Sequence, residues 1–170
     1  TMLIQEDRKM EHVLVSGVAY DKDQARITLR SVPDRPGVSA SLFGPLAQHG
    51  VTDDMIVQNP SRQGVTDMTF TVSRKDLKKA ISITEEVGKD LDGMEILSDS
   101  NVCKVSVIGV GMRNHSGVAA LAFDASYTEN INILMISTSE IKISCLIEEK
   151  YTELAVRTRH DASELVKADA

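Results

Sequence analysis

The chain has no tryptophan, and aromatic residues make up only 4% of its 170 residues. A platform of aromatic side chains for stacking nucleic-acid bases is therefore excluded, and the core must be aliphatic. Basic residues are not in excess either, since the net charge is -6. Without a basic stripe to contact phosphate groups, we expect no nucleic-acid partner.

Long apolar runs are also absent: no stretch approaches the ~18 residues that a membrane-spanning helix needs. Residues 1–10 are too charged and too few for a signal peptide. We therefore expect a cytosolic protein that has no membrane partner.

Cysteine is scarce, and the two cysteines lie in apolar alternating segments at Cys103 and Cys145. They have neither a C-x-x-C spacing nor neighbouring histidine pairs. This pattern predicts buried free thiols and argues against a disulfide or a metal site.

Motifs of catalysis are missing as well, because the chain has no phosphate-cradling glycine loop and no nucleophile elbow. Gly109 and Gly111 come closest, but the third glycine of a nucleotide-binding loop is absent, so a tight turn after a strand is favoured. We expect no catalytic residue, no metal and no cofactor.

An internal repeat is present, with an offset of 80 residues that places Pro36 over Ser116 and Met55 over Met135. Each copy shows an alternating strand, a helix, a hairpin of two strands and a second helix. The first copy comprises strand 25–31, helix 37–49, strands 54–59 and 66–73, helix 74–91 and a last strand at 94–98. The second comprises strand 104–110, helix 117–128, strands 132–139 and 142–148, and helix 150–166.

This order predicts an α+β fold of two tandem ferredoxin-like βαββαβ domains. The second copy lacks its last strand, whereas an extra alternating segment occurs at 11–20. We predict that this segment pairs into the sheet of the second domain, so that the first domain is inserted into the second. The predicted boundaries are 23–98 for the first domain and 10–22 plus 99–168 for the second.

The segment from Asp34 to Ser39 is the candidate site, because a strand gives way there to a short loop and a helix start. Backbone N–H groups of Gly37, Val38 and Ser39 could hold a carboxylate, and Asp34 could accept from an ammonium group. These two contacts fit a free amino acid. The alternative is structural, in which Asp34 caps the helix and Gly37 permits close packing.

The repeat supports the ligand hypothesis. A similar loop recurs at 113–117, and polar residues flank the hairpin strands of both copies. They are Asp54, Gln58 and Asn59 in the first, and Asn130, Asn132, Ser137, Thr138, Ser139 and Glu140 in the second. Polar side chains in aliphatic hairpins need partners, which a ligand at a domain or subunit boundary would supply.

Several of these segments resemble a known family. They are 31–37 (SVPDRPG), 54–59 (DMIVQN), 66–71 (TDMTFT) and above all 135–144 (MISTSEIKIS). Together they resemble the regulatory region of aspartate kinase over about residues 15–165. The amino-terminal kinase domain of that family is absent from the chain.

The resemblance implies a non-catalytic pair of ACT domains that forms a homodimer and binds threonine, lysine or both as effectors. Its partner would be an aspartate kinase catalytic domain or subunit, held under feedback inhibition. The implied first pocket combines Asp34, Gly37, Val38, Ser39 and Gln58 with Asn130, Asn132 and Ile133 of the partner chain. The implied second pocket combines Asp54 with Ala119, Ser139 and Glu140.

One alternative function remains open. In this alternative the ACT sheets only mediate oligomerisation. The pockets have lost their affinity for an effector through changes such as Ala119, a position where related sequences often have threonine.

Overall fold

The structure, a computed structural model, describes residues 17–109 and 116–168. The chain divides into two compact units, the inner unit (residues 23–102) and the outer unit (residues 1–22 and 103–170). The outer unit thus combines segments from both sides of the inner unit in the sequence. The predicted fold class is confirmed: two ferredoxin-like units, the first inserted into the second.

Hydrogen-bonded strands follow the order β2-β3-β1-β4-β6-β5. Two strands contribute residues to both units, β1 (Gly17–Pro33) and β4 (Glu95–Ile108). The sequence predicts two separate strands in place of each: 11–20 and 25–31 for β1, and 94–98 and 104–110 for β4. Both predictions are wrong, because each pair forms one continuous strand within the described residues. The prediction failed because the polar runs 21–24 and 98–101 interrupt the apolar alternation, whereas the backbone ladder of a strand does not depend on apolar side chains.

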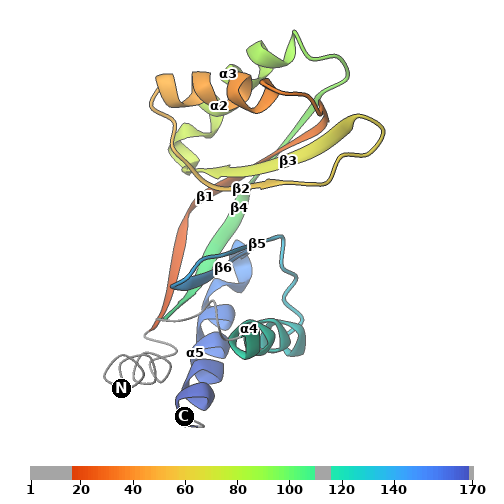
Figure 1. Ribbon diagram of the computed structural model, residues 1–170. Coiled ribbons are helices and arrows are strands. Elements are labelled where there is room, and N and C mark those ends of the chain that lie inside the picture. Colours follow the sequence, from red (N-terminus) through yellow and green to blue (C-terminus); the bar gives the residue numbers. More distant parts are fainter. Residues whose placement is uncertain (1–16, 110–115, 169–170) are drawn as a thin grey trace, which may run out of the picture. The chain divides into compact units, whose positions relative to one another are not determined.

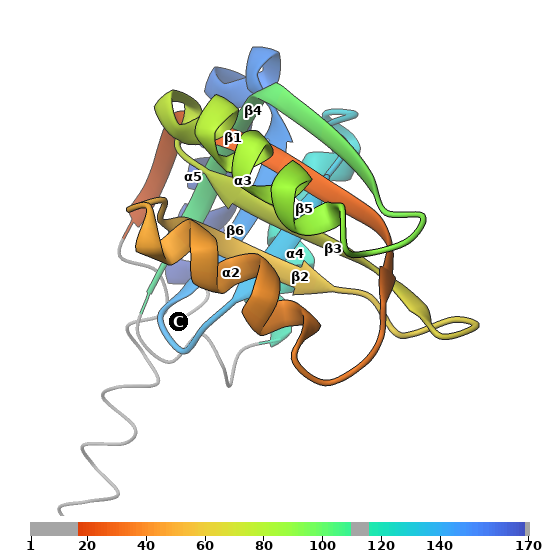
Figure 2. The ribbon, with the colours of Figure 1, turned by 90° about the horizontal axis from the view of Figure 1, so that it is seen from above.

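The inner unit contains α2 (Val38–Gln48), β2 (Asp53–Gln58), β3 (Val65–Val72), a short 3-10 turn (Arg74–Asp76) and α3 (Leu77–Gly88). β3 pairs antiparallel with both neighbours, so that Phe70 lies opposite Ile27 on β1 and Ile56 on β2. The two helices lie side by side over one face of these strands (Figures 1 and 2).

One contiguous cluster forms the core of the inner unit, between this sheet face and the helices. Alternate residues of β1 point into it, namely Ala25, Ile27 and Leu29. The rings of Phe43 and Phe70 meet edge to face with centroids 5.2 Å apart. An aliphatic core was expected, and these two rings are its aromatic exception.

The outer unit contains α4 (Ser116–Thr128), β5 (Met135–Thr138), β6 (Lys142–Glu148), a 3-10 turn (Glu149–Tyr151) and α5 (Thr152–Ala168). The two helices pack against each other on one side of the β5–β6 hairpin (Figure 1). Its buried apolar residues form two smaller clusters, one around Val107, Ile143 and Cys145 and one around Cys103, Val105 and Ile147. Both cysteines are free and buried, as predicted. Within the described ranges, no helix is long and apolar enough to span a bilayer.

Candidate functional site

The loop between β1 and α2 is shaped by backbone hydrogen bonds. The Asp34 N–H donates to the Gly64 carbonyl at 2.9 Å, and the Arg35 N–H donates to the Pro33 carbonyl at 3.2 Å. Gly37 then adopts a φ of 90°, in the region that glycine tolerates best. A Cβ at Gly37 would meet nothing within 4 Å. The backbone conformation therefore requires this glycine, and close packing does not.

Among the described residues, no side chain caps the start of α2. The structural alternative for Asp34, that its carboxylate caps this helix, is therefore wrong. The first intrahelical bond runs from the Ser41 N–H to the Gly37 carbonyl at 2.9 Å, so the N–H groups of Ser39 and Ala40 have no intrahelical acceptor. Such a helix start favours a negatively charged ligand group.

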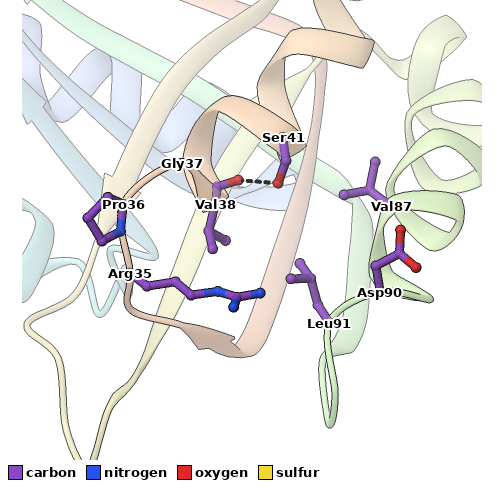
Figure 3. Close-up of a pocket in the computed structure, with 8 residues that line it drawn as sticks. All are labelled: Arg35, Pro36, Gly37, Val38, Ser41, Val87, Asp90 and Leu91. Carbon is purple, nitrogen blue, oxygen red and sulfur yellow. Dashed lines mark hydrogen bonds between the residues drawn. The ribbon is translucent and has the colours of Figure 1, made fainter.

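A cavity of about 350 Å³ opens beside this helix start, within the inner unit. Figure 3 shows Arg35 extending from the loop toward the segment that carries Asp90 and Leu91. The Ser41 hydroxyl donates to the Val38 carbonyl at 2.7 Å. The remaining lining residues are Pro36, Gly37 and Val87. A cation, an anion and a helix start thus line one cavity, which suits a zwitterion.

The register of the hairpin places the two polar candidates of β2 at different ends of the sheet. Gln58 pairs with Met68, which also pairs with Leu29 near the end of β1, and so lies toward the Asp34 loop. Asp54 lies at the other end of β2, beside Asp53, whose partner is Val72. Asp34, Ser39, Gln58 and Asp54 are all exposed, and Val38 is buried.

The other candidates lie in the outer unit, where several have structural roles. Asn130 adopts a φ of 56° where α4 ends, and its N–H donates to the Tyr127 carbonyl at 3.0 Å. Ile133 and Ala119 both pack against the Val107, Ile143 and Cys145 cluster. Asn132 is exposed between α4 and β5. The repeat of the candidate loop, at 113–117, lies largely outside the described residues.

Ser139 closes the turn between β5 and β6, and Glu140 is exposed at its tip. The Ser139 hydroxyl oxygen accepts from the N–H groups of Ile141 at 3.4 Å and Lys142 at 3.2 Å. The Ser139 N–H donates to the Lys142 carbonyl at 2.8 Å. The turn therefore accounts for a serine at this position without a ligand.

A second cavity of about 340 Å³ lies in the outer unit, between the first residues of β1 and α5. It is lined by Val18, Tyr20 and Lys22 from β1, and by Thr152, Glu153, Val156, Arg157, His160 and Asp161 from the helix. No sequence-predicted site residue lines it. Among the described residues, no group of His, Cys, Asp and Glu side chains is arranged to hold a metal ion.

Sequence reasoning missed Arg35 and Asp90 as site residues. Arg35 lies inside the candidate segment from Asp34 to Ser39, so its positive charge could have indicated a partner for a carboxylate. Asp90 follows a helix that begins 40 residues downstream of Gly37, at Leu77, and no local pattern connects the two. Only the packing of α2 beside α3 brings them to one cavity.

Comparisons with known proteins match both halves of the chain to the same family. Models of the ACT domain match residues 27–89 and residues 105–162. An aspartate kinase of Stutzerimonas stutzeri is 49% identical over 162 residues, which cover 95% of this chain and 39% of that protein. The chain thus spans about two fifths of the length of this relative.

Two crystal structures resemble the chain over most of its length. One, of aspartokinase alpha and beta subunits, is 49% identical with a TM-score of 0.80, and covers 88% of this chain and 99% of the other. The other is the ligand-free regulatory subunit of aspartate kinase from Thermus thermophilus. It is 38% identical with a TM-score of 0.84, and the match covers 88% of this chain and 98% of the other.

Proposed function

The chain belongs to the aspartokinase family, whose ACT-domain regulatory region it matches, and from this premise we propose that it binds a free amino acid as an allosteric effector. The observation that carries the proposal is the cavity at the start of α2, where Arg35, Asp90 and the helix N–H groups surround one space. An α-carboxylate pairs with the guanidinium or the helix start, and an ammonium group pairs with a carboxylate.

The proposed effectors are threonine, lysine or both, as the sequence resemblance implies. In this proposal the chain forms a homodimer, and Asn130, Asn132 and Ile133 of the partner chain complete the pocket around Asp34, Gly37, Val38, Ser39 and Gln58. Asp54, Ala119, Ser139 and Glu140 form a second pocket. The exposed side chains of Asp34, Ser39, Gln58 and Asn132 are accessible for such contacts.

Regulation in this proposal is a difference in affinity. The effector binds better to the dimer geometry in which an aspartate kinase catalytic domain or subunit is inactive, and so shifts the population toward it. By reciprocity, dimerisation and effector binding strengthen each other by the same factor, which typically corresponds to about 1–3 kcal/mol. The chain itself is non-catalytic in this view.

Calorimetric titration with threonine and with lysine, across a range of protein concentrations, tests the proposal. We expect heat with at least one of them and tighter binding as the protein concentration rises. Arg35→Ala and Asp90→Asn should each weaken binding at least severalfold. Arg62→Ala is the matched control, because Arg62 is exposed in the β2–β3 loop and does not line the cavity. Absence of heat with both amino acids would refute effector binding.

The alternative function is an ACT module that only mediates oligomerisation. It is favoured by exposed isoleucines at repeat-related positions of the two outermost strands, Ile56 on β2 (49% exposed) and Ile136 on β5 (44% exposed). Apolar side chains on such strands suit pairing between chains. A stable dimer whose melting temperature is unchanged in millimolar threonine and lysine would favour this alternative.

A further inference from the structure

A buried arginine lies in the core of the outer unit. Arg159, on α5, is 2% exposed, and its Nη2 donates to the Ser126 hydroxyl oxygen on α4 at 3.0 Å. The Ser126 hydroxyl in turn donates to the Ala122 carbonyl at 3.0 Å. The Nε and Nη1 atoms of Arg159 have no hydrogen-bond partner among the described residues. One hydroxyl is therefore the only described partner of a five-donor cation.

Among the described residues, no carboxylate acts on this charge. Burial lowers the pKa of the Arg159 guanidinium from its ordinary value, and the nearby Cys145 and Cys103 oppose this shift. Burial also raises the pKa of both thiols, which keeps them neutral at physiological pH. An arginine side chain keeps its proton in proteins, so the core holds a cation that has no counter-charge within residues 17–109 and the described side chains of 119–161.

The internal repeat shows that this arginine occupies a core position. α3 begins at Leu77 and α5 at Thr152, so Arg159 corresponds to Thr84, and Ser126 corresponds to Leu46 at the 80-residue offset. Thr84 and Leu46 are both buried in the inner unit. The inner unit fills these positions without a charge, so the fold does not require a cation there.

Leaving a cation buried and unpaired is strongly unfavourable, and a bound anion is the most direct compensation. We propose that Arg159 is the binding group of a small-anion site inside the outer unit. The ligand is a monovalent anion of the size of chloride or of a one-carbon carboxylate, which accepts from Nε and Nη1. Occupancy of this site stabilises the packing of α4 against α5.

The two cysteines provide a specific probe, because both are buried in the outer unit and the chain has no others. The rate at which a thiol reagent labels them under native conditions reports how often this unit opens. Labelling is measured at constant ionic strength while a bulky sulfonate is replaced by sodium chloride or by sodium formate.

We expect chloride or formate to slow labelling of the wild-type chain, by about 11-fold at ten times the dissociation constant. Arg159→Leu, and the double variant Ser126→Leu with Arg159→Leu that provides an apolar pair, should label at a rate independent of the anion. Arg157→Leu is the matched control, since it removes an exposed positive charge two residues away and should keep the anion dependence.

The proposal is overturned if neither anion slows labelling of the wild-type chain. It is equally overturned if the anion dependence persists in Arg159→Leu or is lost in Arg157→Leu, because the effect would then be one of general electrostatics. The wild-type comparison decides even if a variant does not fold. The test needs no effector amino acid, so its result is independent of the proposed function.

Discussion

Asn130 adopts the left-handed conformation that Gly50 adopts 80 residues earlier, with φ angles of 56° and 73°. Gly50 follows the end of α2 and Asn130 follows the end of α4, and each helix ends with the same two hydrogen bonds. The N–H of residue 50 or 130 bonds to the carbonyl three residues back, and the N–H of Val51 or Ile131 bonds to the carbonyl five residues back. Both pairs form the helix-ending arrangement in which glycine is most common and asparagine next.

This relationship separates two roles of Asn130, a helix terminator and a proposed effector contact. Asn130→Gly should leave the free energy of unfolding of the outer unit unchanged or slightly raised, since glycine accepts this φ without strain. Asn130→Ala should lower it by about 1–2 kcal/mol. Urea unfolding followed by thiol labelling measures both. If Asn130→Gly folds normally but binds threonine or lysine more weakly, the amide contacts the effector; unchanged affinity removes Asn130 from the proposed pocket.

Ser139 allows a similar separation at the β5–β6 turn. Ser139→Ala removes the acceptor of the Ile141 and Lys142 N–H groups. It should lower the free energy of unfolding of the outer unit by about 0.5–1 kcal/mol. This is a small loss for two hydrogen bonds, because the turn is exposed and water can replace the hydroxyl. Ser139→Asp retains an acceptor and should restore stability. Urea unfolding of the three chains is the measurement. Equal stability of all three would show that the hydroxyl contributes nothing to the turn.

Much of the fold could be predicted from the sequence because it depends on local patterns. The repeat and the alternation of apolar residues indicated α2, α3, α4, α5 and both described hairpins, and strand 142–148 was placed at the bounds of β6. Residue pairs that share a position in the repeat, such as Met55 and Met135, are buried alike. A repeat reports a unit of structure even where each single strand is ambiguous.

What could not be predicted depends on packing between distant segments. β1 and β4 run on through polar stretches because each has the other as a hydrogen-bonded neighbour, and the Arg26–Asp99 ion pair, at 3.7 Å, joins them at such a stretch. Asp90 reaches the cavity only through the packing of α3 beside α2. The burial of Arg159 contradicts the usual exposure of arginine, so no pattern of residue types could indicate it.

Gly37 and Gly44 provide a matched pair of glycines in the inner unit. A Cβ would meet nothing within 4 Å at either position, but only Gly37 has a positive φ. Gly37→Ala should lower the stability of the inner unit by about 1–2 kcal/mol and weaken effector binding by moving the start of α2. Gly44→Ala, inside the helix, should raise stability by about 0.5–1 kcal/mol. Thermal unfolding and calorimetry measure both, and a stabilising Gly37→Ala would contradict the assigned backbone role.

The buried thiols predict a pH dependence above neutrality. Burial raises the pKa of the Cys145 thiol, and the charge of Arg159 opposes this shift. As pH rises, the unfolded chain therefore loses the thiol proton first, near its ordinary pKa of about 8.5. The free energy of unfolding should be unaffected by this group below that pH and fall above it. Urea unfolding between pH 7 and 10 should show a steeper fall for the wild type than for Cys145→Val; parallel curves would exclude a buried neutral thiol.

The predicted domain boundaries, 23–98 and 10–22 plus 99–168, stay a prediction, and a truncation tests them. Val18, near the start of β1, packs against both apolar clusters of the outer unit. Deleting residues 1–22 should therefore expose Cys103 and Cys145 to rapid labelling, while amide exchange in the inner unit stays slow. Deleting only residues 1–16 leaves β1 intact and is the control. Tyr127 and Tyr151, which remain after the longer deletion, also lie in the outer unit, so their fluorescence should change together with the labelling rate. Slow labelling after the longer deletion would show that the outer unit folds without its first strand, and the boundaries 10–22 plus 99–168 would then be wrong.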